Sequence, residues 1–196
     1  MANWTNGADV AVIDVPGFVA ELKEHAGDHK FHIHDERHFI ETYSMRQSWE
    51  VDLHPERACG GPLDLHLSLE IEPRTLLQFE DQLLDQGDLD DPPTTYYFPI
   101  VFTWVLPPLH DPPDLLVLAT DLAGIGGSNL PLKVSCVDST MEVTDAAERT
   151  LSITARVEIG VHDIYVHQDN LCDIFDRCYS VSEFLLDHAP VWLNDL

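Results

Sequence analysis

Apolar and polar residues alternate along three segments of the chain. In residues 63–72 every odd position carries Leu or Ile, while the even positions carry Asp, His, Ser or Glu. Segments 39–53 and 151–161 follow the same period, and a change of phase after the second predicts a β-bulge near His162 and Asp163. Successive side chains of a strand point to opposite faces, so the pattern predicts strands with one buried and one solvated face. Such strands are typical of an antiparallel sheet.

Further strands are predicted between and after these segments. Proline and glycine at positions 55, 60, 61 and 62 separate the first two alternating segments, which predicts a hairpin with a long loop. Segments 96–106 and 115–119 are apolar on both faces and are interpreted as more central strands, and 130–137 as another strand. Pro99 predicts an edge position or a bulge within 96–106.

Three segments have helical patterns. Residues 16–25 follow Asp14, a candidate N-cap, and residues 75–84 have Leu and Phe at helical spacing. The longest pattern covers 170–186, with a broad apolar stripe, a cap at position 169 or 170 and Pro190 after its end.

Together these elements predict one α+β domain over residues 1–196. Its largely antiparallel, curved sheet of six or seven strands packs against a C-terminal amphipathic helix and a short N-terminal helix. Residues 85–93, with four Asp, are expected to form a mobile acidic loop.

The charge balance excludes several classes of partner. Thirty-five acidic residues stand against ten Lys and Arg, giving a net charge of −25. Binding to nucleic-acid phosphates or to an anionic membrane surface needs a cationic patch, so neither is expected. The acidity is explained by solubility, by a high-salt environment or by a basic protein partner.

The compartment is inferred from the cysteines and from the apolar segments. The four cysteines show no C-x-x-C spacing, which indicates free thiols rather than a disulfide framework or a zinc ribbon. The sequence shows neither a signal-peptide pattern nor an apolar run near the roughly 20 residues of a membrane span. We therefore expect a cytoplasmic protein.

His32 and His34 form the one pattern that predicts a metal site. Two histidines at H-x-H spacing point to the same side of a strand, where both imidazoles can reach one ion, with Asp35 or His38 as a possible third ligand. The alternative interpretation is two solvated histidines on the wet face of an edge strand.

Catalytic motifs are not found. The glycine-rich segment 124–129 lacks the G-K-[ST] of a P-loop and precedes a predicted strand, so we interpret it as a turn. The sequence contains no G-x-S-x-G elbow, and no residue is nominated as catalytic.

Three functions remain open. The first is a non-enzymatic binding protein, such as an adaptor, chaperone-like or immunity-type factor, acting on a protein partner through a sheet face or apolar groove. The second is a domain, with or without enzymatic activity, that binds an apolar small ligand in a cavity between the sheet and the C-terminal helix, lined by Tyr97, Trp104 and Phe175. The third is a metal-binding protein or metal-dependent enzyme that uses His32 and His34; the cofactor itself is not identified by the sequence.

Overall fold

The protein is an α+β fold built on one six-stranded antiparallel sheet, as the alternation predicts. The computed structural model describes residues 13–86, 92–140, 148–167 and 170–194. The sheet is curved and open, its spatial order is β1-β2-β3-β4-β6-β5, and every neighbouring pair is antiparallel. The strands are β1 (Phe31–Ile40), β2 (Gln47–Pro55), β3 (Asp64–Ile71), β4 (Tyr97–Val105), β5 (Leu132–Ser139) and β6 (Glu148–Gly160).

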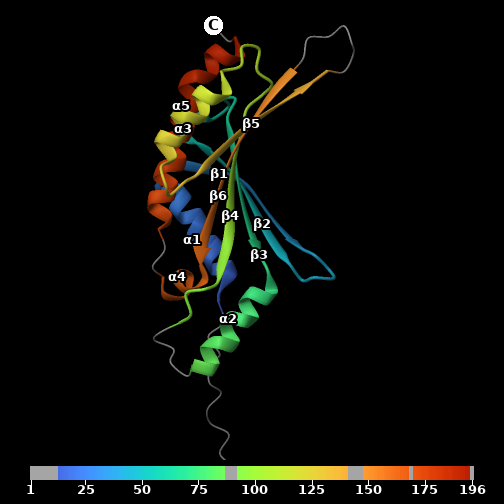
Figure 1. Cartoon of the computed structure of the whole chain (residues 1–196), viewed down its shortest axis with the longest axis vertical. Helices are drawn as coiled ribbons and strands as arrows, with labels where there is room; N and C mark the ends of the chain where they lie inside the picture. The colour runs from blue at the N-terminus through green and yellow to red at the C-terminus, as the bar shows by residue number, and fades with distance from the viewer. Residues whose placement is uncertain (1–12, 87–91, 141–147, 168–169, 195–196) are drawn as a thin grey trace, which may run out of the picture.

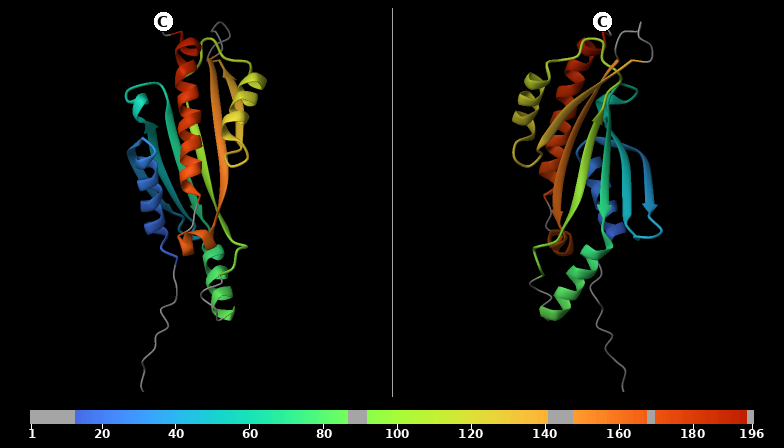
Figure 2. Two further views of the ribbon diagram at one scale, coloured as in Figure 1. Left: turned by 90° about the vertical axis from the view of Figure 1, so that its left-hand side faces the viewer. Right: turned by 45° about the vertical axis from the view of Figure 1, so that its right-hand side comes forward.

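Helices cover one face of the sheet and leave the other open. Three of them lie side by side over the inner face: α1 (Val15–Asp28), α5 (Leu171–Leu193) and α3 (Leu115–Gly126), with α5 in the middle (Figure 2, left). Two others, α2 (Pro73–Gln86) and α4 (Val161–Val166), lie at one end of the sheet (Figure 1). Among the described residues no helix crosses the opposite, outer face (Figure 2, right).

The alternation of the strands separates core from solvent. The odd positions of β2 from Trp49 to Leu53, the odd positions of β3 and the even positions of β4 are buried and form one apolar cluster with the facing side chains of the helices. Burial of this apolar area supplies the main driving force for folding. The outer face therefore carries the polar positions of the same strands, and any polar site on the sheet must lie there.

The helices begin and end largely where local signals predict. The Asp14 carboxylate accepts a hydrogen bond from the Gly17 amide (3.0 Å) and caps α1. Helix α2 contains the predicted 75–84, and α5 begins directly after Asn170. However, α5 continues through Pro190 to Leu193, whereas the sequence predicts that it ends before this proline.

The prediction of a strand at 115–119 is wrong, because this segment opens α3. The Asp114 carboxylate caps the helix by accepting hydrogen bonds from the Leu116 and Val117 amides. Gly127, with a φ of 61°, ends it, since a positive φ is costly for other residues. The glycine-rich segment is thus the last turn of a helix and the turn that leads into β5, and no helix begins there.

Three further local predictions need correction. Segment 39–53 is not one strand: β1 ends at Ile40, and β2 begins at Gln47 after a turn in which Met45 has a φ of 58°. The change of phase after residue 161 marks α4 instead of a bulge. Pro99 lies in a central strand, at a point where pairing with β3 has already ended at Ile100, so its missing N–H costs no ladder bond on that side.

Two expectations concern the limits of the described chain. Most of the predicted acidic loop, residues 87–91, lies outside the described residues, and positions 85 and 86 belong to α2. No helix within the described residues has the length and apolar character needed to cross a bilayer.

Candidate metal centre

Three histidines and one cysteine converge on the outer face, at the β1–β2 end of the sheet. His32 lies directly opposite His54 in the antiparallel register of β1 and β2, so both side chains point to this face. His34 and Cys59 lie beside them. We call His32, His34, His54 and Cys59 the sheet cluster.

A β-bulge brings His34 into this cluster. The pairing runs from Ile33↔Leu53 to Asp35↔Asp52, so His34 is the extra residue of β1. A bulge places two consecutive residues opposite one residue of the partner strand and re-aims their side chains. As a result the His34 Nε2 atom lies 3.3 Å from His54 Nε2, and the two rings are tilted by 31° with their centroids 4.0 Å apart.

Cys59 reaches the cluster because the loop after β2 folds back on the strand. The loop begins with a short 3-10 turn (Glu56–Ala58), and the Glu56 amide donates to the Lys30 carbonyl just before β1 (3.0 Å). Gly60, with a φ of 73°, turns the chain away again directly after Cys59. This path holds the thiol beside β1.

The distances within the sheet cluster are slightly shorter than those between the ligands of a tetrahedral ion, so a small outward movement of the side chains admits one ion. The Cys59 Sγ atom lies 2.9 Å from His54 Nε2 and 3.2 Å from His32 Nδ1. Bonds of about 2.0–2.1 Å to nitrogen and about 2.3 Å to sulfur place tetrahedral ligand atoms roughly 3.3–3.6 Å apart. The ligand atoms of His32, His54 and Cys59 all lie within 4.8 Å of one another, which is the spacing one ion requires.

A carboxylate stands behind the first histidine. His32 faces Cys59 with Nδ1, while its Nε2 atom lies 3.6 Å from Glu56 Oε1. Metal-bound histidines commonly direct their second ring nitrogen to a carboxylate, which orients the ring and raises its basicity. Glu56 therefore occupies the position of an outer ligand partner.

His54 is the buried member of the cluster. Its residue is 4% exposed, and burial, followed by the neighbouring His34 and His32, lowers its pKa. A lowered pKa keeps the ring neutral, which is the form that binds metals. Its Nδ1 atom has no hydrogen-bond partner among the described residues, so all polar contacts of this ring are made through Nε2, toward the cluster.

A charged network continues along the same face. Arg37 makes two parallel hydrogen bonds to Asp52 (2.8 and 2.9 Å) and also pairs with Asp35 and Glu50. These bonds hold the pKa of Asp52 below its ordinary value, and His66 contributes in the same direction from 2.6 Å. These ion pairs give Arg37 and its acidic partners a structural role on the outer face.

The three predicted ligand-lining residues are not brought together. Trp104 and Phe175 are buried in the core between the sheet and α5, where the Trp104 indole donates to the Ser182 hydroxyl (3.0 Å) and Phe175 contacts Phe102. Tyr97 is 51% exposed and, by the alternation of β4, points to the outer face. These residues therefore cannot line one pocket.

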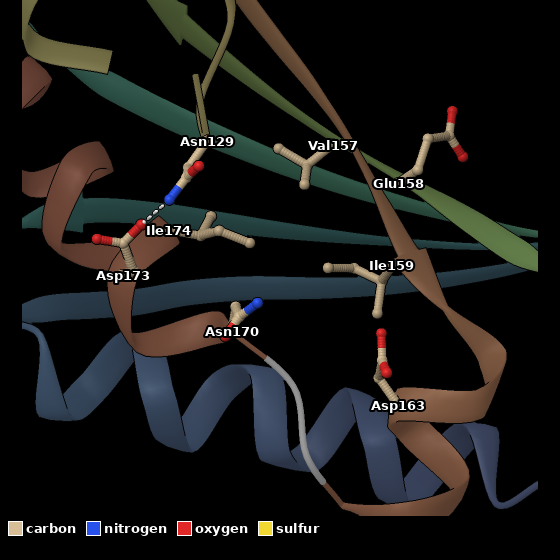
Figure 3. A pocket seen from close by; sticks show the side chains of 8 residues that line it. All are labelled: Asn129, Val157, Glu158, Ile159, Asp163, Asn170, Asp173 and Ile174. Carbon is tan, nitrogen blue, oxygen red and sulfur yellow. Dashed lines mark hydrogen bonds between the residues drawn. The ribbon is translucent and has the colours of Figure 1, made fainter. Parts of the chain in front are cut away.

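A polar pocket of about 220 Å³ lies between the end of β6, α4 and the start of α5 (Figure 3). The Asn129 amide donates to the Asp173 carboxylate across it (2.6 Å), and this bond, with Arg177, lowers the pKa of Asp173. Its carboxylates are not among the groups of described residues whose ligand atoms lie within 4.8 Å of one another. The pocket thus lacks the close ligand set that the sheet cluster has.

The sequence pattern predicts two of the four cluster residues, His32 and His34, but not His54 and Cys59. His54 was visible as a polar residue of the alternating pattern, and Cys59 as a loop cysteine five residues later. Their approach to His32 depends on the register of β1 and β2, which the incorrect single strand at 39–53 concealed. The spacing H-x4-C after an H-x-H strand is the signal that could have joined them.

Comparison of the chain with family models, with curated proteins and with solved structures gave no match.

Proposed function

We propose that this protein binds a transition-metal ion of the Zn²⁺ type at the sheet cluster. The ligands are Nδ1 of His32, Nε2 of His54 and Sγ of Cys59. His34 contacts His54 but lies outside this group, and it becomes the fourth ligand by turning its ring toward the ion. The observation that carries the proposal is the convergence of one thiol and two imidazoles from different segments within 4.8 Å. Imidazole and thiolate together favour Zn²⁺ and related ions over Mg²⁺ or Ca²⁺, which prefer oxygen ligands.

The number of ligands favours binding over catalysis. Once His34 has turned in, four protein ligands fill a tetrahedral site and leave no position for substrate, whereas catalytic zinc keeps one position open. Three of the four ligands are exposed, so the ion would exchange with solvent. The net charge of −25 raises the concentration of cations around the protein. We infer a metal-binding protein, in line with the sequence-based expectation of a non-enzymatic binding role.

The ligand chemistry also bears on location. Cys59 and Cys172 are exposed free thiols, and a thiolate binds metal only while it is reduced. These residues support the expected cytoplasmic location, where thiols are kept reduced.

Cobalt titration of the untagged chain tests the proposal. Co²⁺ adopts zinc sites and gives a thiolate-to-metal charge-transfer absorption in the near ultraviolet when a cysteine is bound. We expect this absorption to be weaker in Cys59→Ala, because the sheet cluster then has no thiolate ligand. It should stay unchanged in Cys136→Ala, a matched control on β5. Full absorption in Cys59→Ala, with unchanged Co²⁺ affinity in His54→Gln, would overturn the proposal.

A second candidate function, binding of a basic protein, is supported by the tip of the β1–β2 hairpin. The turn and the end of β1 expose four large apolar side chains, of which Tyr43 is 98% exposed: Phe39, Ile40, Tyr43 and Met45. A contiguous exposed apolar group often marks an interaction site, and the acidic chain favours a basic partner. β1 is also an edge strand, with unpaired backbone groups on one side.

Site-specific photo-cross-linking in cells tests this candidate. A photoreactive residue at position 43 should give one discrete, salt-sensitive product with a basic protein, and the same residue at Gln78 on α2 should give none. Identical products from both positions would contradict it.

A further inference from the structure

A second group of metal-ligating side chains lies between α1 and α5. His25, His29 and Cys172 each offer one ligand atom, and these three atoms lie within 4.8 Å of one another. Cys172 Sγ is 3.6 Å from His25 Nδ1. We call these three residues the helix cluster. It shares no residue with the sheet cluster.

The two histidines reach the same point because of helical spacing. Residues four apart lie on one side of a helix, one turn above the other, and two imidazoles at this spacing are a common ligand pair for zinc. His25 lies in the last turn of α1 and His29 at its C-cap. Cys172 lies in the first turn of α5, opposite both.

His29 is held in a fixed orientation. Its Nδ1 atom lies 2.7 Å from Asp176 Oδ1, and its ring stacks on Phe175 at a centroid distance of 6.3 Å. The side chain is only 16% exposed although Asp176 itself is largely in solvent. A carboxylate on one ring nitrogen is the usual surrounding of a metal-bound histidine, and it directs the other nitrogen to the ion.

A nucleophilic Cys–His pair explains the geometry less well. In such a pair the histidine next to the thiol is oriented by a third group. Within the described residues His25 has no carboxylate partner, whereas the oriented histidine is His29. A catalytic pair of Cys172 and His25 would also not account for His29, whose ligand atom lies within 4.8 Å of both.

We propose that the helix cluster is a second metal site, which takes Zn²⁺ or a related ion on His25, His29 and Cys172. Asp176 orients His29, and water takes the fourth position because Cys172 is exposed. The bound ion clamps the N-terminal helix to the C-terminal one. The proposal uses the same ligand chemistry as the sheet cluster but does not depend on its occupancy.

Cobalt titration of the untagged full chain and its cysteine variants tests the proposal. The wild type and Cys136→Ala should bind two Co²⁺ ions with thiolate charge-transfer absorption. Cys59→Ala and Cys172→Ala should each retain one such ion, and the double variant none. His25→Asn, which keeps the thiol, should weaken the ion that remains in Cys59→Ala by at least tenfold. Circular dichroism shows whether each variant is folded.

Hydrogen exchange with and without Zn²⁺ supplies a second measurement. Zinc should slow exchange at the end of α1 and the start of α5 in Cys59→Ala, and have no effect there in Cys172→Ala.

The outcomes separate the two sites. Full thiolate absorption in Cys172→Ala, or none in Cys59→Ala, would overturn the helix site and leave the sheet site standing. Absorption that disappears in Cys172→Ala alone would overturn the sheet site and support the helix site.

Discussion

The sheet cluster and the helix cluster use the same kinds of ligand but are assembled in different ways. In the sheet cluster the residues in contact are 5, 20 and 27 positions apart, and one hairpin with its loop brings them together. In the helix cluster His25 and Cys172 are 147 positions apart, and the two ends of the fold must dock before they meet. The first cluster therefore depends on local structure, and the second on the complete tertiary fold.

This difference has an energetic consequence. An ion that closes a loop removes conformational entropy from the unfolded chain, and this effect grows slowly with loop length. Loops of 147 and 27 residues differ by about 1.5 kcal/mol on this basis. In addition, ligands that are close in sequence stay close in the unfolded chain and can bind an ion weakly there. This binding reduces the stabilisation that an ion gives at a local site.

The largest expected effect is stabilisation by zinc. A free concentration 100 times the Kd stabilises the fold by about 2.7 kcal/mol at a site that the unfolded chain does not bind, which raises the Tm by about 5–11 °C for a chain of this size, and by less at a local site. Calorimetry should show a larger loss of this rise in Cys172→Ala than in Cys59→Ala, with no loss in Cys136→Ala. An equal loss in both variants would contradict the contrast between local and long-range sites.

Phe175→Leu should separate the two clusters. Phe175 is fully buried, packs on Phe31 and Phe102 and stacks on His29. The smaller side chain should reduce the free energy of unfolding by about 1–2 kcal/mol, measured by urea denaturation. Co²⁺ binding should weaken at the helix cluster and stay unchanged at the sheet cluster. Equal weakening at both would show that the hairpin is not an independent unit.

Two matched substitutions probe the carboxylates behind the histidines. Glu56→Gln should lower Zn²⁺ affinity at the sheet cluster about tenfold, and Asp176→Asn should do so at the helix cluster, because each removes the charged partner of a ligand. Competition with a fluorescent zinc indicator measures both, in the Cys172→Ala and Cys59→Ala backgrounds respectively. If each substitution affected the other cluster instead, the assignment of ligand partners would be wrong.

Asp52→Asn tests the polar network beside the sheet cluster, with a smaller and pH-dependent effect. Hydrogen bonds from Arg37 lower the pKa of Asp52 from its ordinary value of 3.8. The pair therefore stabilises the fold above that pH, and the contribution disappears as the pH falls through the lowered pKa. Urea denaturation with a chelator present should show the variant about 1 kcal/mol less stable at pH 7 and equal to the wild type in strong acid. A difference that persists in strong acid would contradict this assignment.

The sequence predicts the layers of this fold well, because period-two alternation is visible wherever one face of a strand is wet. The buried and exposed positions of β3, for example, follow directly from its Leu and Ile residues. The strand predicted at 115–119 is wrong because a fully apolar run shows neither the strand period nor the helix period. The turn at 41–46 is not visible in the sequence because Tyr43 and Met45 continue the apolar–polar alternation of a strand. In the structure both side chains are exposed.

Two of the four residues of the sheet cluster can be predicted from the sequence. The spacing of His32 and His34 is local and shows in the sequence. The contribution of His54 and Cys59 depends on strand register and on the path of a loop, neither of which a single sequence determines. In the helix cluster the spacing of His25 and His29 is local, but the approach of Cys172 depends on the docking of two distant helices, which no local pattern indicates.

A crystal structure of the zinc-loaded chain, with data at the zinc absorption edge, tests the sheet cluster directly as a metal site. We predict an anomalous peak on the outer face of the sheet, about 2.0–2.1 Å from a ring nitrogen of each of His32, His34 and His54 and about 2.3 Å from the Cys59 sulfur. Crystals grown at saturating zinc with no peak among these four side chains, or with a peak that Cys59 does not contact, would contradict it.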